Sequence, residues 1–231
     1  IIFGALLTKV GLYSIIRTYG LFYYESNFIK SYLLILGAIS IIAGCIGAIY
    51  QKDLKQIVVF NIVISLGVMV CGTATLNTFG VKGALFYAVN DILLKAALFI
   101  IVGLIIYVSG VKYIQKCGLI NKYPLLGWTY FIVVLSLAGV PPFSGFYGKA
   151  LIIKGLVANN NTFIAILVAL SGLVVFYSLI KIFLNVFYDN INKSLILKPL
   201  PKGVQIPLIA IVAIALIIGV SSNLLEGFFD K

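Results

Sequence analysis

The chain has 231 residues, of which 62% are hydrophobic and only 10% are charged, and its formal net charge is +11 with no histidine. This composition excludes an ordinary soluble domain, because successive apolar runs of about 20 residues would leave large apolar patches in water. The lysines at the edges of those runs indicate contact with a membrane surface rather than with nucleic acid.

Eight apolar segments are predicted to be helices that cross or enter a bilayer. They span residues 1–24, 31–50, 56–74, 82–108, 124–140, 143–158, 162–187 and 204–222. Most connections are short, and no soluble domain fits between the segments. The fold class is therefore all-α, a polytopic transmembrane helical bundle, with one transmembrane domain over residues 1–231. If the segments alternate across the bilayer, lysines fall on both sides, so the positive-inside rule does not fix the orientation.

A proline and glycine cluster interrupts the apolar sequence in LAGVPPFSGFYGK, residues 137–149. The cluster contains Pro141, Pro142, Gly145 and Gly148. We expect a discontinuous helix here, with non-helical backbone from Pro141 to Gly148. Such backbone is tolerated inside a membrane only where protein or a water-filled cavity satisfies its polar groups, as in ion and solute pathways. Spacing leaves open whether residues 124–158 form two spans or one interrupted span.

Asp91 is an acidic residue well inside an apolar segment, FYAVNDILLKAALF (residues 86–99), and Lys95 follows it one helical turn later. A charge at the bilayer centre costs at least ~2.5–3.5 kcal/mol, so opposite charges on one helix face are expected to share hydrogen bonds. Two interpretations follow. The pair is either a structural staple within the bundle or a step in a proton or cation relay. The relay is favoured, because ionisable residues inside a membrane are rarely inert.

Three further lysines are candidates for the same path. Lys149 follows the proline and glycine cluster, and a lysine desolvated beside unwound backbone can release and rebind a proton. Lys9 lies within the first apolar run, where the alternative is a side chain that snorkels to a helix end. Lys55 stands in QKDLKQ, which is equally typical of a polar loop with an acidic partner.

Chemistry on a bound substrate is not indicated by the sequence. Cys45, Cys71 and Cys117 are widely spaced and odd in number, which argues against a disulfide framework or a metal site. The sequence also has no phosphate-binding glycine loop and no nucleophile with a neighbouring base. We therefore expect no cofactor, no metal and no redox centre, and partners that are membrane subunits and lipid.

Four motifs occur in order along the chain: TKVGLYSIIRT (8–18), KDLKQIVVF (52–60), NDILLKAALF (90–99) and LAGVPPFSGFYGK (137–149). They resemble successive signatures of the antiporter-like membrane subunits shared by Mrp-type sodium/proton antiporters, NADH:quinone oxidoreductase (complex I) and membrane-bound hydrogenases. The family protein is much longer, so the chain resembles its C-terminal half. The helices that would carry the glutamate usually partnered with the lysine matching Lys9 are then missing.

The resemblance implies that Lys9 and Lys149 lie at the breaks of two discontinuous helices related as inverted repeats, with Lys55 and Lys95 between them. It implies a line of lysines and polar residues, joined by water, along which protons move. The chain is then expected to be a proton or Na+/H+ translocating subunit of a multisubunit cation antiporter in the cell membrane, on the D-type branch of the Mrp subunits. The alternatives are a proton-pumping subunit of an NADH:quinone oxidoreductase or hydrogenase, which would make it part of an enzyme, and a structural remnant that transports nothing.

The chain departs from the family pattern in its titratable groups. Asp91 stands where the family commonly has histidine, and Phe60 and Asn61 replace a usual Tyr-Ser. The missing imidazole is the side chain whose charge changes near neutral pH. Proton transfer would therefore depend on Asp91, Lys95 and water.

Overall fold

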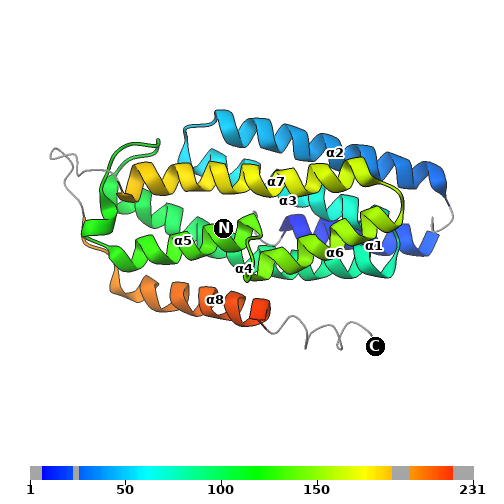
Figure 1. Ribbon diagram of the computed structural model, residues 1–231. Helices are drawn as coiled ribbons and strands as arrows, with labels where there is room; N and C mark the ends of the chain where they lie inside the picture. The colour runs from blue at the N-terminus through cyan, green and yellow to red at the C-terminus, as the bar shows by residue number, and fades with distance from the viewer. Residues whose placement is uncertain (1–6, 23–25, 189–197, 221–231) are drawn as a thin grey trace.

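The computed structural model describes residues 7–22, 26–188 and 198–220, which form an elongated bundle of helices along one axis (Figure 1). The helices are α1 Thr8–Phe22, α2 Asn27–Tyr50, α3 Leu54–Ala74, α4 Thr78–Ser109, α5 Pro124–Ala138, α6 Ser144–Ala158, α7 Thr162–Ile182 and α8 Lys202–Val220. A 3-10 turn, Leu119–Asn121, precedes α5, and a π-helical stretch, Phe183–Tyr188, extends α7. In these ranges β geometry is confined to an isolated bridge between Asp53 and Tyr113.

The predicted fold class is confirmed in the described part of the chain. Four helical segments there are long and apolar enough to cross a membrane, namely α2, α3, α4 and Thr162–Tyr188, and α5 and Ile206–Gly219 are shorter apolar helices. Within the described residues, each predicted apolar segment overlaps one of the helices. The chain is therefore a multi-pass membrane protein.

The helix breaks where the prolines stand, between Ala138 and Ser144. Gly139 ends α5 with a φ of 83°, a left-handed conformation that glycine adopts without a steric penalty. Pro141 and Pro142 lie in the non-helical connection that follows. The helix is discontinuous as expected, but its non-helical part is shorter than expected.

Gly145 and Gly148 correct the predicted extent of the break, because both lie within the first turns of α6. Their role is close packing. A Cβ atom on Gly145 would overlap the carbonyl oxygen of Ser136, and a Cβ on Gly148 would lie 3.0 Å from the Tyr87 Cα on α4. These glycines let α6 approach α5 and α4, which holds the two sides of the break together.

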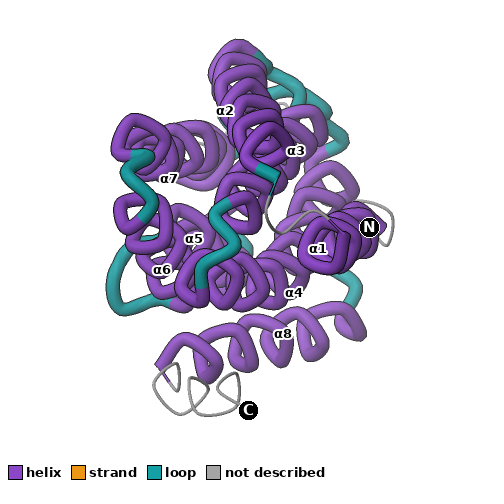
Figure 2. The backbone as a smooth tube through the Cα atoms, turned by 90° about the vertical axis from the view of Figure 1, so that its right-hand side faces the viewer, coloured by secondary structure: helices purple, strands orange, loops and turns teal. Residues whose placement is uncertain are grey.

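Together α5 and α6 form one interrupted span. The 32-residue helix α4 packs against both of them and serves as a reference for the direction in which α5 and α6 run. α5 begins near the end of α4, whereas α6 ends near its start, where Asn77 Nδ2 donates to the Gly155 carbonyl and Asn159 Nδ2 donates to the Thr75 carbonyl. α5 and α6 therefore follow one another along the bundle (Figures 1 and 2).

The packing role of Gly145 predicts a large effect from a single methyl group. Gly145→Ala should lower the thermal stability of the detergent-solubilised protein, because overpacking typically costs ~1–3 kcal/mol and the obstructing atom is backbone. Gly103→Ala on α4 is the matched control, since a Cβ there meets nothing within 4 Å. Equal melting temperatures for the two variants would contradict the packing role.

Candidate functional site

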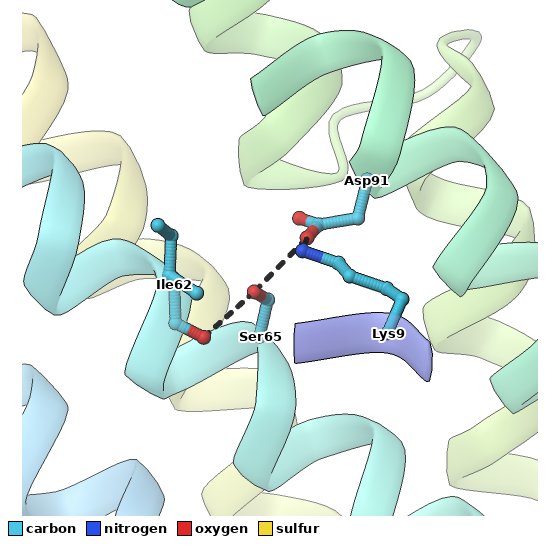
Figure 3. A network of polar contacts seen from close by, with 4 residues as sticks. All are labelled: Lys9, Ile62, Ser65 and Asp91. Carbon is cyan, nitrogen blue, oxygen red and sulfur yellow. Dashed lines mark hydrogen bonds and ion pairs between the residues drawn. The ribbon is translucent and has the colours of Figure 1, made fainter. Parts of the chain in front are cut away.

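A buried ion pair joins α1 to α4 inside the bundle. Lys9 Nζ lies 2.6 Å from Asp91 Oδ2, and the two side chains are 4% and 0% exposed. Ser65 Oγ on α3 lies 3.1 Å from the same carboxylate oxygen and 2.9 Å from the Ile62 carbonyl oxygen (Figure 3). The single hydroxyl proton can be donated to only one of these acceptors at a time. Three helices thus converge on one carboxylate.

The expected pairing of Asp91 with Lys95 is not what the structure shows. Asp91 pairs with Lys9, and within the described ranges Lys95 makes no hydrogen bond or ion pair, although it is 1% exposed. Lys9 enters from α1 and occupies the carboxylate with a contact of 2.6 Å, which leaves Lys95, one turn further along α4, without it. Two buried lysines therefore stand near one buried acid.

Lys149 lies at the helix break and satisfies backbone groups that the break leaves open. Its Nζ donates to the Leu137 carbonyl at 3.1 Å and to the Ala138 carbonyl at 2.8 Å, and the residue is 6% exposed. Carbonyls at a helix C-terminus lack helical partners and carry the negative end of the helix dipole. The Tyr87 ring centroid is 5.7 Å from the same Nζ. The C-terminal end of α5 thus binds an ammonium group through its open carbonyls.

One face of α4 links these two centres. Tyr87, Asp91 and Lys95 recur every four residues, so they follow one another along the helix. Tyr87 contacts Lys149, and Asp91 contacts Lys9. Asn90 Oδ1 also accepts a hydrogen bond of 2.5 Å from Ser144 Oγ, the first residue of α6.

Several buried polar atoms near this face lack a hydrogen-bond partner in the part of the chain that is described. They are Asn61 Oδ1, Asn90 Nδ2, Asp91 Oδ1 and Ser136 Oγ, in side chains that are 0–1% exposed. Buried polar groups are nearly always hydrogen-bonded, and internal water commonly supplies the partner. We interpret these atoms as contacts for water that joins the polar side chains of α3, α4 and α5.

Lys55 does not join this cluster, which corrects its expected position between Lys9 and Lys149. It is exposed in the first turn of α3, where Asp53 Oδ1 accepts a hydrogen bond from its backbone N–H at 2.8 Å. Lys55 is therefore a surface residue beside an acidic one, which agrees with the alternative interpretation of QKDLKQ as a polar stretch. Lys9 lies in the first turn of α1, and the helix break implied beside it falls outside the described residues.

Sequence reasoning missed the neutral partners of the charged groups. Ser65 and Ser144 are examples, and Asn61 Nδ2 also donates to Ser178 Oγ on α7 at 3.1 Å. A signal was present, because Asn61 and Ser65 stand four residues apart in an otherwise apolar run of α3. Neutral polar residues at helical spacing inside a membrane helix indicate a polar face.

Comparisons with known proteins agree on one family. The family model described as "NADH:quinone oxidoreductase/Mrp antiporter, TM" matches residues 1–175. The chain is 36% identical to the D-type subunit of the Na(+)/H(+) antiporter of Bacillus subtilis (strain 168), in an alignment that covers 100% of the chain and 47% of that protein. The chain therefore spans about half the length of this relative.

Solved structures share the fold. The structure of the Mrp complex from Dietzia sp. DQ12-45-1b contains a chain with a TM-score of 0.89 at 22% identity, covering 96% of this chain and 50% of that one. Respiratory complex I from Thermus thermophilus with bound NADH contains a chain with a TM-score of 0.85 at 25% identity, covering 98% of this chain and 48% of that one.

Proposed function

The chain belongs to the NADH:quinone oxidoreductase/Mrp antiporter membrane family, and on that premise we propose that it is a cation-translocating subunit of a multisubunit Na+/H+ antiporter in the cell membrane. We propose further that residues 1–231 correspond to the C-terminal half of such a subunit, and that other membrane subunits complete the assembly. The relatedness to a D-type antiporter subunit over the whole chain supports this choice.

The observation that carries the proposal is the buried Lys9–Asp91 ion pair, 2.6 Å long. Taking two charges out of water is expensive, and apolar residues of similar volume are often at least as stabilising at such a place. A pair retained at membrane depth, with Lys95 and Lys149 also buried, is typical of an ion pathway. The same cost argues against a remnant that transports nothing.

The proposed path runs from Lys9 and Asp91, past Lys95, to Lys149 at the end of α5. A proton that passes from the Lys9 ammonium to Asp91 leaves both side chains neutral. Its onward transfer, through water, to the neutral amine of Lys95 one turn along α4 restores the carboxylate, which is then the counter-ion of the Lys95 ammonium. Water bonded to the unpartnered oxygen of Asp91 would connect these steps. Lys55 is left outside this path.

A proton-pumping subunit of a respiratory complex is the second candidate, favoured by the structural likeness to a complex I chain. It would use the same path and take its energy from a redox reaction in another subunit. Both candidates move protons between the same groups and differ in the source of energy and in the coupled ion.

The function is tested in everted membrane vesicles that contain the chain with the subunits it assembles with, from a host without other sodium/proton antiporters. Respiration sets up a pH gradient, and added NaCl should dissipate it as Na+ exchanges for protons. Vesicles from the host alone give the background. A respiratory subunit would instead raise NADH-driven proton uptake above the host background without a sodium response, and a remnant would leave both signals at that background, so either result would overturn the proposal.

A further inference from the structure

The two ends of the bundle differ in their lysines. One end, here called the lysine-rich end, consists of residues 51–55, 108–123 and 198–203. Main-chain hydrogen bonds join its segments: Leu54 N donates to Lys112 O at 3.0 Å, Ile114 N to Lys52 O at 2.9 Å, and Lys198 N to Val108 O at 3.1 Å. In Figure 1 this end is where the loop after α4 meets the start of α8.

Exposed lysines gather at the lysine-rich end: Lys52, Lys55, Lys112, Lys116, Lys122 and Lys198. At the opposite end, residues 26–30, 75–82 and 154–162 contribute Lys30, Lys82 and Lys154. The difference appears only because α5 and α6 make one span. If α5 and α6 were two alternating spans, Lys198 would lie at the end opposite Lys122, whereas Tyr123 Oη donates to the Lys198 carbonyl at 2.8 Å.

A small apolar cavity opens beside Lys122, in the seam between α5 and the start of α8, and Tyr123 in its wall donates a hydrogen bond to the Lys198 carbonyl. Its volume is about 140 Å³, and Leu125, Leu126, Leu200 and Leu208 contribute to its wall while Lys122 lies at its edge. The cavity therefore suits a molecule with an anionic group beside Lys122 and an apolar tail inside the cavity.

A tyrosine ring lies near each of the two lysines at this end of the bundle. Lys122 Nζ lies 5.8 Å from the Tyr123 ring centroid, and Lys198 Nζ lies 5.8 Å from that of Tyr107. Tyrosine is enriched where a membrane protein crosses from the hydrocarbon region to the headgroups. The edge of the cavity therefore lies at headgroup level.

We propose that the lysine-rich end faces the cytoplasm and that the α5–α8 seam binds an anionic phospholipid there. The headgroup phosphate lies between Lys122 and Lys198, and part of an acyl chain enters the apolar cavity. Cytoplasmic loops carry the excess of Lys and Arg, and the cytoplasmic leaflet is the anionic one, so orientation and ligand follow from the same charges. An acidic face of a neighbouring protein is disfavoured, because the cavity beneath the lysines is apolar and suits a lipid tail.

Lipid binding is tested on the purified assembled complex in a neutral detergent. Dioleoyl phosphatidylglycerol should raise its melting temperature more than dioleoyl phosphatidylcholine does, and the double variant Lys122→Gln with Lys198→Gln should lose at least half of that difference. Lys30→Gln with Lys82→Gln, at the opposite end, is the matched control and should keep it. Equal shifts with the two lipids, or a full difference in the Lys122 and Lys198 variant, would overturn the proposal.

Other occupants give different results in the same preparation. A shift produced equally by inorganic phosphate would mean a free-anion site and would reject the lipid. A photo-crosslinking residue in place of Leu125 should give lipid adducts, and an adduct with a neighbouring subunit would show that a protein covers the seam.

Orientation is tested independently by cysteine labelling. Lys112→Cys should react with a membrane-impermeant maleimide in everted vesicles and not in right-side-out ones, and Thr162→Cys at the opposite end should do the reverse. The native Cys117 gives little background, because it is 1% exposed and burial raises the pKa of its thiol. The opposite labelling pattern would place the lysine-rich end outside.

Discussion

Replacing Lys149 with alanine should abolish sodium-dependent proton movement while leaving the chain inserted in the membrane. Lys149 is the buried ammonium that meets the open carbonyls of α5, through hydrogen bonds to Leu137 and Ala138. Removing a positioned proton-transfer group typically costs at least about 100-fold in rate. The measurement is the initial rate of sodium-induced dissipation of the pH gradient, divided by the amount of chain in the vesicles.

Two further variants separate transport from structure at this position. Lys149→Arg keeps a positive charge that can donate to both carbonyls, but a guanidinium does not give up its proton. It should therefore assemble and remain inactive. Lys154→Ala on the same helix is the control, because that lysine is exposed, with its Nζ 3.9 Å from the Phe79 ring centroid, and its loss should leave the rate unchanged. A native rate in Lys149→Ala would remove Lys149 from the path.

Replacing Asp91 with asparagine should stop translocation and also weaken the protein. The change leaves Lys9 buried without its counter-ion, and breaking a buried pair by removing one partner typically costs ~3–5 kcal/mol. Ser65 loses a charged acceptor at the same time. We expect a lower melting temperature of the solubilised complex together with a rate at background. Unchanged transport in Asp91→Asn would exclude the carboxylate from the path.

Exchanging the pair decides between a staple and a relay. The double variant Lys9→Asp with Asp91→Lys keeps two opposite charges on the same helices, so it should recover much of the stability lost in Asp91→Asn. A relay also needs the carboxylate on α4, beside Lys95 and the polar side chains of α3, so transport should stay at background. Transport at the native rate in the exchanged protein would mean that the pair only holds α1 to α4.

The elements of the fold could be predicted from the sequence, because a bilayer demands long apolar helices and prolines interrupt them. Asp91 and Lys149 could be singled out for the same reason, since a charge inside an apolar run is conspicuous. The prediction was poorer for residues whose role depends on the three-dimensional course of the backbone. Gly145 and Gly148 read as helix breakers beside two prolines, but they are packing positions inside α6.

The pairing of side chains could not be predicted, because helical periodicity relates only residues of the same helix. Periodicity predicted Lys95 as the partner of Asp91, whereas Lys9 binds the carboxylate from another helix. Ser65 and Ser144 were missed because a single serine in an apolar helix does not show which group faces it, and only the four-residue spacing of Ser65 from Asn61 indicated a polar face. The orientation also depended on tertiary structure, since it required α5 and α6 to be counted as one span.

If one hydrogen-bonded path connects Lys9 to Lys149 within this chain, a cryo-EM map of the assembled complex that resolves ordered water will show it. Water should be bonded to Asp91 Oδ1, Asn61 Oδ1 and Ser136 Oγ, with successive donor–acceptor distances of no more than about 3.2 Å between the two lysines. A dry, apolar gap between Asp91 and Lys149 would contradict it.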